Sequence, residues 1–206
     1  MPVSRETLIP TYFGERKEEI SRYAEILATW GIERGLIGPK EGDRIWERHI
    51  ANCIPITTLI EKGASLIDIG SGAGLPGIVI ALARPDLKVT LLEPLQRRVD
   101  FLNEVVAELK LDILVARGRA ESFRGSFGVV TARAVAPLPK LLTVSWHLVA
   151  PGGAVLAMKG EAAETELAEA ELEVRKVFKK VSRSEVHEIT VGELPLARVV
   201  ELRKAG

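Results

Sequence analysis

From residue 65 onward, short apolar segments alternate with helical ones, and this alternation constrains the fold more than any other feature of the chain. Five segments rich in Val, Ile and Leu are nearly free of polar residues, which is typical of strands buried on both faces of a parallel sheet. They are SLIDI, KVTLLE, ILVAR, GVVTA and GAVLAMK. Helical segments lie between them, at about 77–84, 97–109, 138–148 and 161–181. The pattern predicts a doubly wound α/β domain.

The two ends of the chain have other patterns. Apolar residues at spacings of three and four predict helices in residues 1–64, with a kink or break at Pro55. In the tail, SEVHEITV and ARVVEL are joined by the short GELPL and predict an antiparallel pair at one sheet edge. We therefore expect a helical extension, residues 1–64, packed on an α/β domain of residues 65–206.

Composition limits which partners and which cellular compartment we expect for the protein. The 28 basic and 28 acidic residues cancel, so total charge gives no indication of a nucleic-acid partner. No apolar run approaches the ~20 residues of a membrane span, the N-terminus lacks a signal-peptide pattern, and one cysteine forms no internal disulfide. We expect a cytoplasmic monomer without a membrane segment. Six glutamates in residues 161–173 predict a solvated helix face.

The stretch LIDIGSGAGLPG, residues 66–77, has two interpretations. Read from Gly72 it is G-x-G-x-x-G, the dinucleotide fingerprint. Read from Asp68 it is D-x-G-x-G-x-G, the loop of enzymes that use S-adenosylmethionine (SAM). Glu93 ends the next strand, where a carboxylate accepts the ribose hydroxyls that NAD and SAM share. Glu93 therefore predicts a nucleoside ligand without distinguishing the two.

Asp68 favours SAM. A buried negative charge ahead of the loop would oppose a pyrophosphate, whereas SAM has no phosphate and carries a sulfonium and an ammonium group. About 140 residues of α/β sequence also leave no second domain for a hydride acceptor. After the third strand, Ala120 and Glu121 are placed to frame an adenine through a backbone N–H and a carboxylate.

Several stretches together resemble one family. DIGSGAGLPG, LLEPLQRRVDFL, GRAE, VVTARAVAPL and the upstream WERHIANC are similar to the bacterial small-subunit ribosomal RNA methyltransferase G family, also called glucose-inhibited division protein B. The resemblance covers about residues 45–160. It implies a class I SAM-dependent fold, with a mostly parallel sheet and an antiparallel edge strand. It also implies N7 methylation of one guanine in the decoding-region loop of 16S rRNA.

The resemblance also implies roles for single residues. The methionine and ribose side of SAM would be lined by Gly70, Gly72, Gly74 and Leu75. Glu93 would hold the ribose, Ala120 and Glu121 the adenine, and Arg133 would reach the cofactor or the incoming base. In one departure from the family, Gly128 stands where an acid is expected early in the fourth strand.

The implied chemistry needs little from the protein. Guanine N7 carries a lone pair and no proton, so no general base is required and catalysis would be mostly positioning. We assign no certain catalytic residue; the candidates are Arg133, Lys159 and His49, of which His49 either faces the substrate crevice or packs against it. His49 and Cys53 have the i, i+4 spacing of metal ligands but too few further partners, so we expect no metal.

Basic residues at strand ends suggest how RNA is bound. Arg117, Arg119, Arg133 and Lys159 would rim the edge that carries the glycine loop and dock phosphates of 16S rRNA or the small subunit. Three alternatives stay open: a SAM-dependent methylase of a small molecule or protein, an NAD-linked oxidoreductase that uses the Gly72 register, and a cofactor-binding regulatory protein without catalysis.

Overall fold

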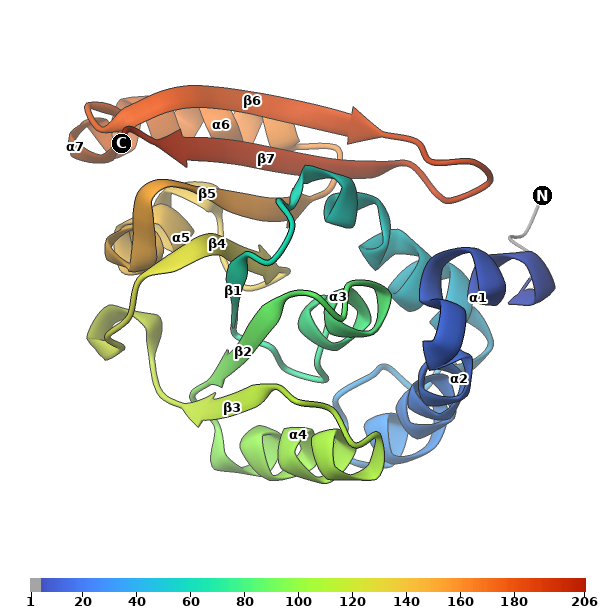
Figure 1. Cartoon of the computed structure of the whole chain (residues 1–206). Helices are drawn as coiled ribbons and strands as arrows, with labels where there is room; N and C mark the ends of the chain where they lie inside the picture. The colour runs from blue at the N-terminus through green and yellow to red at the C-terminus, as the bar shows by residue number, and fades with distance from the viewer. Residues whose placement is uncertain (1–4) are drawn as a thin grey trace.

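The five apolar segments form the parallel part of a seven-stranded sheet, as the sequence predicts (Figure 1). The computed structural model describes residues 5–206. Its strands are β1 (Ser65–Ile69), β2 (Lys88–Glu93), β3 (Leu114–Arg117), β4 (Phe127–Arg133), β5 (Val149–Lys159), β6 (Val181–Ile189) and β7 (Ala197–Lys204). They lie in the order β3-β2-β1-β4-β5-β7-β6, and β7 runs antiparallel to both β5 and β6. The expected antiparallel pair therefore closes one edge of the sheet.

Helices cover both faces of this sheet. They are α3 (Gly77–Ala83), α4 (Gln96–Glu108), α5 (Leu138–Ser145), α6 (Ala163–Glu173) and α7 (Arg175–Phe178). Successive residues of a strand point to opposite faces, and in β1 Leu66 joins one apolar cluster while Ile67 joins the other. The first cluster includes Ile78 of α3 and the second Leu138 of α5. The strands are thus buried on both sides, which explains their continuous apolar sequence.

The N-terminal region shares the first cluster. Its helices are α1 (Arg5–Phe13) and α2 (Lys17–Ile26), followed by short helical turns at Leu27–Gly31, Gly42–Arg44, Ile45–Ile50, Ala51–Cys53 and Pro55–Leu59. Ile20 and Ile50 are fully buried in the same cluster as Ile78. Pro55 begins a new turn, as expected for a residue that lacks the backbone N–H of a continuing helix.

The helix predicted over residues 161–181 is wrong in its second half. Helix α6 ends at Glu173, and the backbone of Val174 (φ −112°, ψ 46°) leaves the helical region before the short α7. Val181 then begins β6 rather than ending a helix. Val174, Val177 and Val181 all pack on the second cluster, so apolar spacing alone did not separate a helix from a turn followed by a strand.

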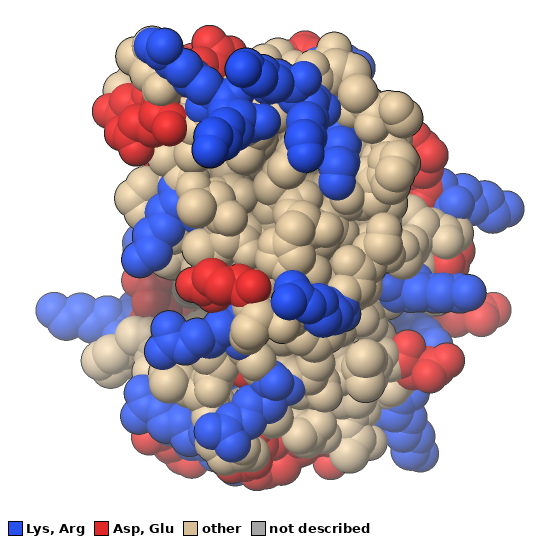
Figure 2. All heavy atoms as spheres, turned by 90° about the vertical axis from the view of Figure 1, so that its left-hand side faces the viewer, with Lys and Arg blue, Asp and Glu red and all other residues tan. Residues whose placement is uncertain are grey.

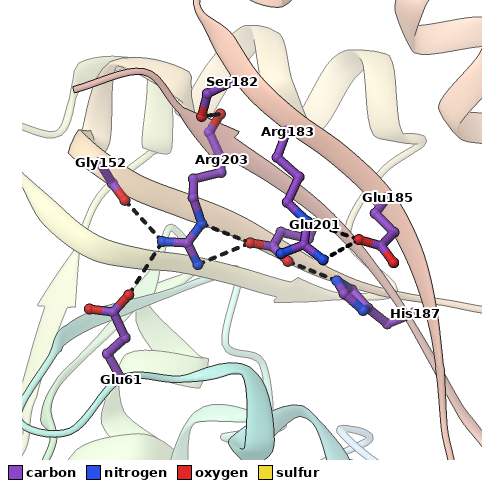
Figure 3. A network of polar contacts seen from close by, with 8 residues as sticks. All are labelled: Glu61, Gly152, Ser182, Arg183, Glu185, His187, Glu201 and Arg203. Atoms are coloured by element: carbon purple, nitrogen blue, oxygen red, sulfur yellow. Dashed lines mark hydrogen bonds and ion pairs between the residues drawn. The ribbon is translucent and has the colours of Figure 1, made fainter.

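A polar network around the buried Glu201 links the β6–β7 hairpin to the rest of the fold (Figure 3). Glu201 is 3% exposed and accepts hydrogen bonds from His187 Nε2 at 2.7 Å and Arg203 Nε at 3.0 Å. Arg203 also donates to the Gly152 carbonyl at 3.0 Å and lies 3.5 Å from Glu61. Arg203 therefore links three parts of the chain: β7, the start of β5 and the N-terminal region.

Within residues 5–206, no helix has both the length and the apolar character needed to cross a bilayer.

Candidate active site

The glycine loop connects β1 to α3 at the carboxyl end of the sheet. Gly70, Gly72 and Gly74 have φ angles of 65°, 59° and 94°, a region that other residues rarely adopt. Gly77 is required by packing instead, because a Cβ there would lie 2.4 Å from the Leu91 side chain. The start of α3 at Gly77 therefore lies very close to β2.

Asp68 lies beneath this loop. It is fully buried, and its Oδ2 accepts a hydrogen bond from the Gly77 N–H at 3.1 Å. Its Oδ1 is buried without a partner among the described residues. Burial raises the pKa of the Asp68 carboxyl to about 7. The sequence pattern predicted this carboxyl near the ligand, and the structure places it behind the backbone that would contact the ligand.

Glu93 holds the loop from the neighbouring strand. Its two carboxylate oxygens accept hydrogen bonds from the N–H groups of Gly72 and Leu95, both at 3.0 Å. Arg98 Nη1 lies 3.8 Å away, and Glu93 is only 1% exposed. Each carboxylate oxygen has a second lone pair, so these contacts leave acceptor capacity for ribose hydroxyls.

A cavity of about 190 Å³ opens beside the loop, at the ends of β1, β2 and β3. Its wall is largely apolar, and Glu121 stands on its lining as an exposed carboxylate. The lining includes Gly70, Leu92, Ala120, Glu121, Leu141 and Val144. The structure therefore brings the sequence-predicted residues Gly70, Ala120 and Glu121 together around one space of a size suited to a purine base.

A larger crevice of about 680 Å³ lies next to this cavity. Four cations and two carboxylates, Glu161 and Glu166, line it, together with apolar Met158 and Leu196. The cations are Arg48, Arg133, Lys159 and Arg198. Val135 and Ala136 line both spaces, so the loop between β4 and α5 is the wall between them.

This wall is held in place by residues of α6 and β5. A Cβ added to Gly70 would lie 2.9 Å from a Val135 methyl group, so Val135 sits directly on the glycine loop. Lys159 Nζ donates to the Ala136 carbonyl and contacts Glu166, both at 2.7 Å. Glu166 also accepts from the Leu138 N–H at 2.8 Å. The solvated face predicted for residues 161–173 is therefore wrong for Glu166. Lys159 lines the crevice and also holds the loop between β4 and α5 in place.

Arg133 is oriented by a chain of polar contacts from the N-terminal region. Its Nη2 lies 2.9 Å from His49 Nδ1, and His49 Nε2 lies 3.2 Å from Glu41. Because a guanidinium only donates, Nδ1 must accept and the imidazole proton sits on Nε2, facing Glu41. Burial and the Arg133 charge lower the pKa of His49, which keeps this neutral form. His49 thus packs behind the crevice.

Cys53 also contacts Arg133, with its Sγ 3.7 Å from Nη1. Burial raises the pKa of the Cys53 thiol to about 11, so it stays protonated near neutral pH. The i, i+4 pair of His49 and Cys53 is therefore bridged by one arginine, and both side chains serve to place its guanidinium.

Tyr23 is a contact of the glycine loop that sequence reasoning missed. Its hydroxyl donates to the Ala73 carbonyl at 2.8 Å, and the ring is fully buried. A Cβ on Gly74 would lie 2.9 Å from the same hydroxyl. The sequence placed Tyr23 on the apolar face of a helix but carried no indication of its partner, which lies 50 residues away.

The remaining sequence candidates lie at different places. Leu75 is 6% exposed and packs in the first core cluster, whereas Arg117 and Arg119 are exposed at the end of β3, with Arg119 on the cavity rim. Gly128 lies at the opposite end of β4, where its N–H donates to Ser65 Oγ at 3.0 Å. The departure at Gly128 is therefore remote from the glycine loop.

Comparison with solved structures shows which fold this is. A methyltransferase from Pyrococcus furiosus aligns with a TM-score of 0.58 and 18% identity, over 74% of this chain and 84% of that one. A SAM-dependent methyltransferase from Aquifex aeolicus aligns with a TM-score of 0.58 and 16% identity, over 84% of this chain and 96% of that one. At this identity the likeness concerns the fold alone, and it confirms the expected class I methyltransferase architecture.

Comparison with curated proteins is more specific. A Thermobifida fusca protein named ribosomal RNA small subunit methyltransferase G is 58% identical over 165 residues, 79% of this chain and 70% of its own length. A Mycobacterium relative of the same name is 49% identical over 201 residues, 94% of this chain and 88% of its own. The model of the family described as rRNA small subunit methyltransferase G matches residues 16–194. The chain therefore belongs to the rRNA small subunit methyltransferase G family.

Proposed function

We propose that this protein transfers a methyl group from SAM to N7 of one guanine in the 16S rRNA of the small ribosomal subunit. The observation that carries the proposal is the pair of adjoining spaces, a cavity suited to a purine base and a cation-lined crevice, which share the wall formed by Val135 and Ala136. The family excludes the oxidoreductase alternative.

The residues present fit the cofactor. The glycine loop has no side chains at Gly70, Gly72 and Gly74, which all have positive φ, and Gly70 lines the cavity. The Glu93 carboxylate keeps lone pairs for ribose hydroxyls, and Ala120 and Glu121 frame the apolar cavity. SAM, when bound, supplies an electrophilic methyl group on a sulfonium.

The crevice suits an RNA base with its flanking phosphates. Arg48, Arg133 and Arg198 line it as cations, and the guanidinium of Arg133 is fixed by His49 before any substrate arrives. Such a preset donor can orient a guanine or a phosphate at little entropic cost. Because N7 needs no deprotonation, these residues do their work by binding, orienting and excluding water. No acid–base residue is assigned.

The test is methyl transfer to small subunits from a strain that lacks the endogenous activity. Labelled SAM supplies the methyl group, and mass spectrometry of rRNA fragments locates it. The expected result is 7-methylguanine at a single position of 16S rRNA. Methylation of another base or atom, or transfer to protein or a small molecule with none to rRNA, would contradict the proposal.

A further inference from the structure

A second cluster of cations lies outside the crevice, on and just after α7. It consists of Arg175, Lys176, Lys179 and Lys180, which we call the α7 surface. All four side chains are exposed, and none makes an ion pair within residues 5–206. By contrast, Arg84 and Arg198 each lie 2.7 Å from a carboxylate. The α7 surface therefore concentrates unneutralised positive charge.

Packing explains why these charges face outward. Val174, Val177 and Phe178 pack against the second core cluster and fix the short helix to the sheet. Near this surface, burial and the charge of Lys180 lower the pKa of Lys204, whose ammonium donates to the Val149 carbonyl at 2.7 Å. Lys180 therefore lies close to the end of β7, and its carbonyl accepts a hydrogen bond from the Ala205 N–H at 2.9 Å.

The α7 surface lies far from the crevice. Arg198, which lines the crevice, is near the start of β7, and Lys204 is at its end, paired with Val181 just after α7. Lys204 is six residue steps along the extended strand from Arg198, about 20 Å at the usual rise per residue. In Figure 1, α7 and the C-terminus lie together at one end of the hairpin. Figure 2 shows Lys and Arg side chains gathered at the top of the face on that side.

We propose that the α7 surface docks phosphates of the 16S rRNA at a distance from the methylated base. This rests on the proposed function, because a large RNA can reach both places at once. The protein has no net charge, so local clusters rather than total charge must attract RNA. Lysines and an arginine on one exposed turn bind phosphates as charges, so this surface adds affinity without reading sequence.

The experiment compares two triple variants of the full chain. One is Lys176→Gln/Lys179→Gln/Lys180→Gln. The matched control, Lys17→Gln/Lys62→Gln/Lys110→Gln, removes the same charge from three exposed lysines elsewhere that make no ion pair within the described residues. Affinity for 16S rRNA and methyl transfer to small subunits are measured over a range of salt concentrations.

The α7 variant should bind rRNA several-fold more weakly and show a higher KM for subunits, with kcat and the KM for SAM unchanged. Its salt slope should fall by about 0.7 for each phosphate that the variant no longer neutralises. Equal behaviour of the two variants overturns the proposal, as does loss of binding to phosphatidylglycerol vesicles with unchanged rRNA affinity. Wild-type protein that binds rRNA without methylating it would contradict the proposed function alone, since the affinity comparison still tests the α7 surface.

Discussion

At the scale of single residues, the glycine loop rests on side chains that stand behind it. Asp68 lies under the turn into α3, Glu93 holds Gly72, and Tyr23 holds Ala73. The sequence predicted Asp68 and Glu93 because both belong to strand ends beside the loop. It could not predict Tyr23, since a helix face shows which residues are buried and not which atoms they meet.

Asp68 should make stability depend on pH. Its pKa in the folded protein is about 7, above the ordinary 3.8. Its stabilising contribution is therefore complete below about pH 4 and is lost as pH rises through 7. Between pH 5 and pH 8, the wild type should lose more unfolding free energy than Asp68→Asn, as measured by urea denaturation.

The comparison of the wild type with Asp68→Asn isolates the titration of Asp68, because His49 titrates in both proteins. Its lowered pKa acts in the opposite direction and favours the folded state as pH rises. Asp86→Asn is the control variant, because the hydrogen bond from Arg84 lowers the pKa of the Asp86 carboxyl instead of raising it. Identical pH dependence in wild type and Asp68→Asn would show that Asp68 is not held as the structure indicates.

Tyr23→Phe should weaken SAM binding. The change leaves the buried Ala73 carbonyl without its donor, at a cost of about 1–3 kcal/mol, and loosens the glycine loop. Calorimetry should show a Kd for SAM raised several-fold. The control is Tyr12→Phe, whose hydroxyl lies 3.4 Å from the Val191 carbonyl, outside the loop. Equal SAM affinity in both variants would show that the Tyr23 hydroxyl does not contribute to SAM binding.

At the scale of elements, the loop between β4 and α5 forms the wall between the cavity and the crevice. It is clamped through Ala136 and Leu138 by Lys159 and Glu166. The sequence predicted β4, α5 and the crevice position of Lys159. The role of Glu166 was hidden, because one inward-facing glutamate among six acidic residues looks like the rest of a solvated face.

Glu166→Gln should slow methyl transfer. A neutral amide holds Lys159 less strongly than a carboxylate does, so the wall carrying Val135 would lose its fixed position. Charge-assisted hydrogen bonds of this kind contribute about 1.5–3 kcal/mol, which corresponds to a roughly tenfold or greater loss of kcat/KM. Steady-state kinetics with small subunits would measure it. Glu169→Gln, an exposed change on the same helix, should leave the rate unaltered. If both variants match wild type, the contact between Lys159 and Glu166 is not needed for methyl transfer.

At the scale of the whole molecule, the N-terminal helices pack on the core and the C-terminal hairpin completes a sheet whose parallel strands and antiparallel edge pair were predictable from the sequence. The glycine loop and the five apolar segments were sufficient to predict the parallel core, because each of these patterns lies within one short stretch of sequence. Contacts between distant segments were not predictable, and the network of Glu201 and Arg203 is an example. Glu61 and Gly152 meet Arg203 only after the chain has folded (Figure 3).

Arg203→Ala should destabilise the fold. It deprives the buried Glu201 of a cationic partner and should lower the unfolding free energy by about 1–3 kcal/mol. Arg198→Ala breaks a pair with the exposed Glu188 and should cost at most about 1 kcal/mol. Denaturant titrations of the two variants would compare them. A larger loss for Arg198→Ala would contradict the role given to this network.

We expect the cavity beside the glycine loop to hold the nucleoside of SAM and to direct its sulfur toward the cation-lined crevice. A crystal structure with bound S-adenosylhomocysteine tests it most directly. We predict the adenine beside Ala120 and Glu121, the ribose hydroxyls on Glu93, and the sulfur next to Val135 and open to the crevice that contains Arg133. A nucleoside bound elsewhere, or a sulfur closed off from that crevice, would contradict the account.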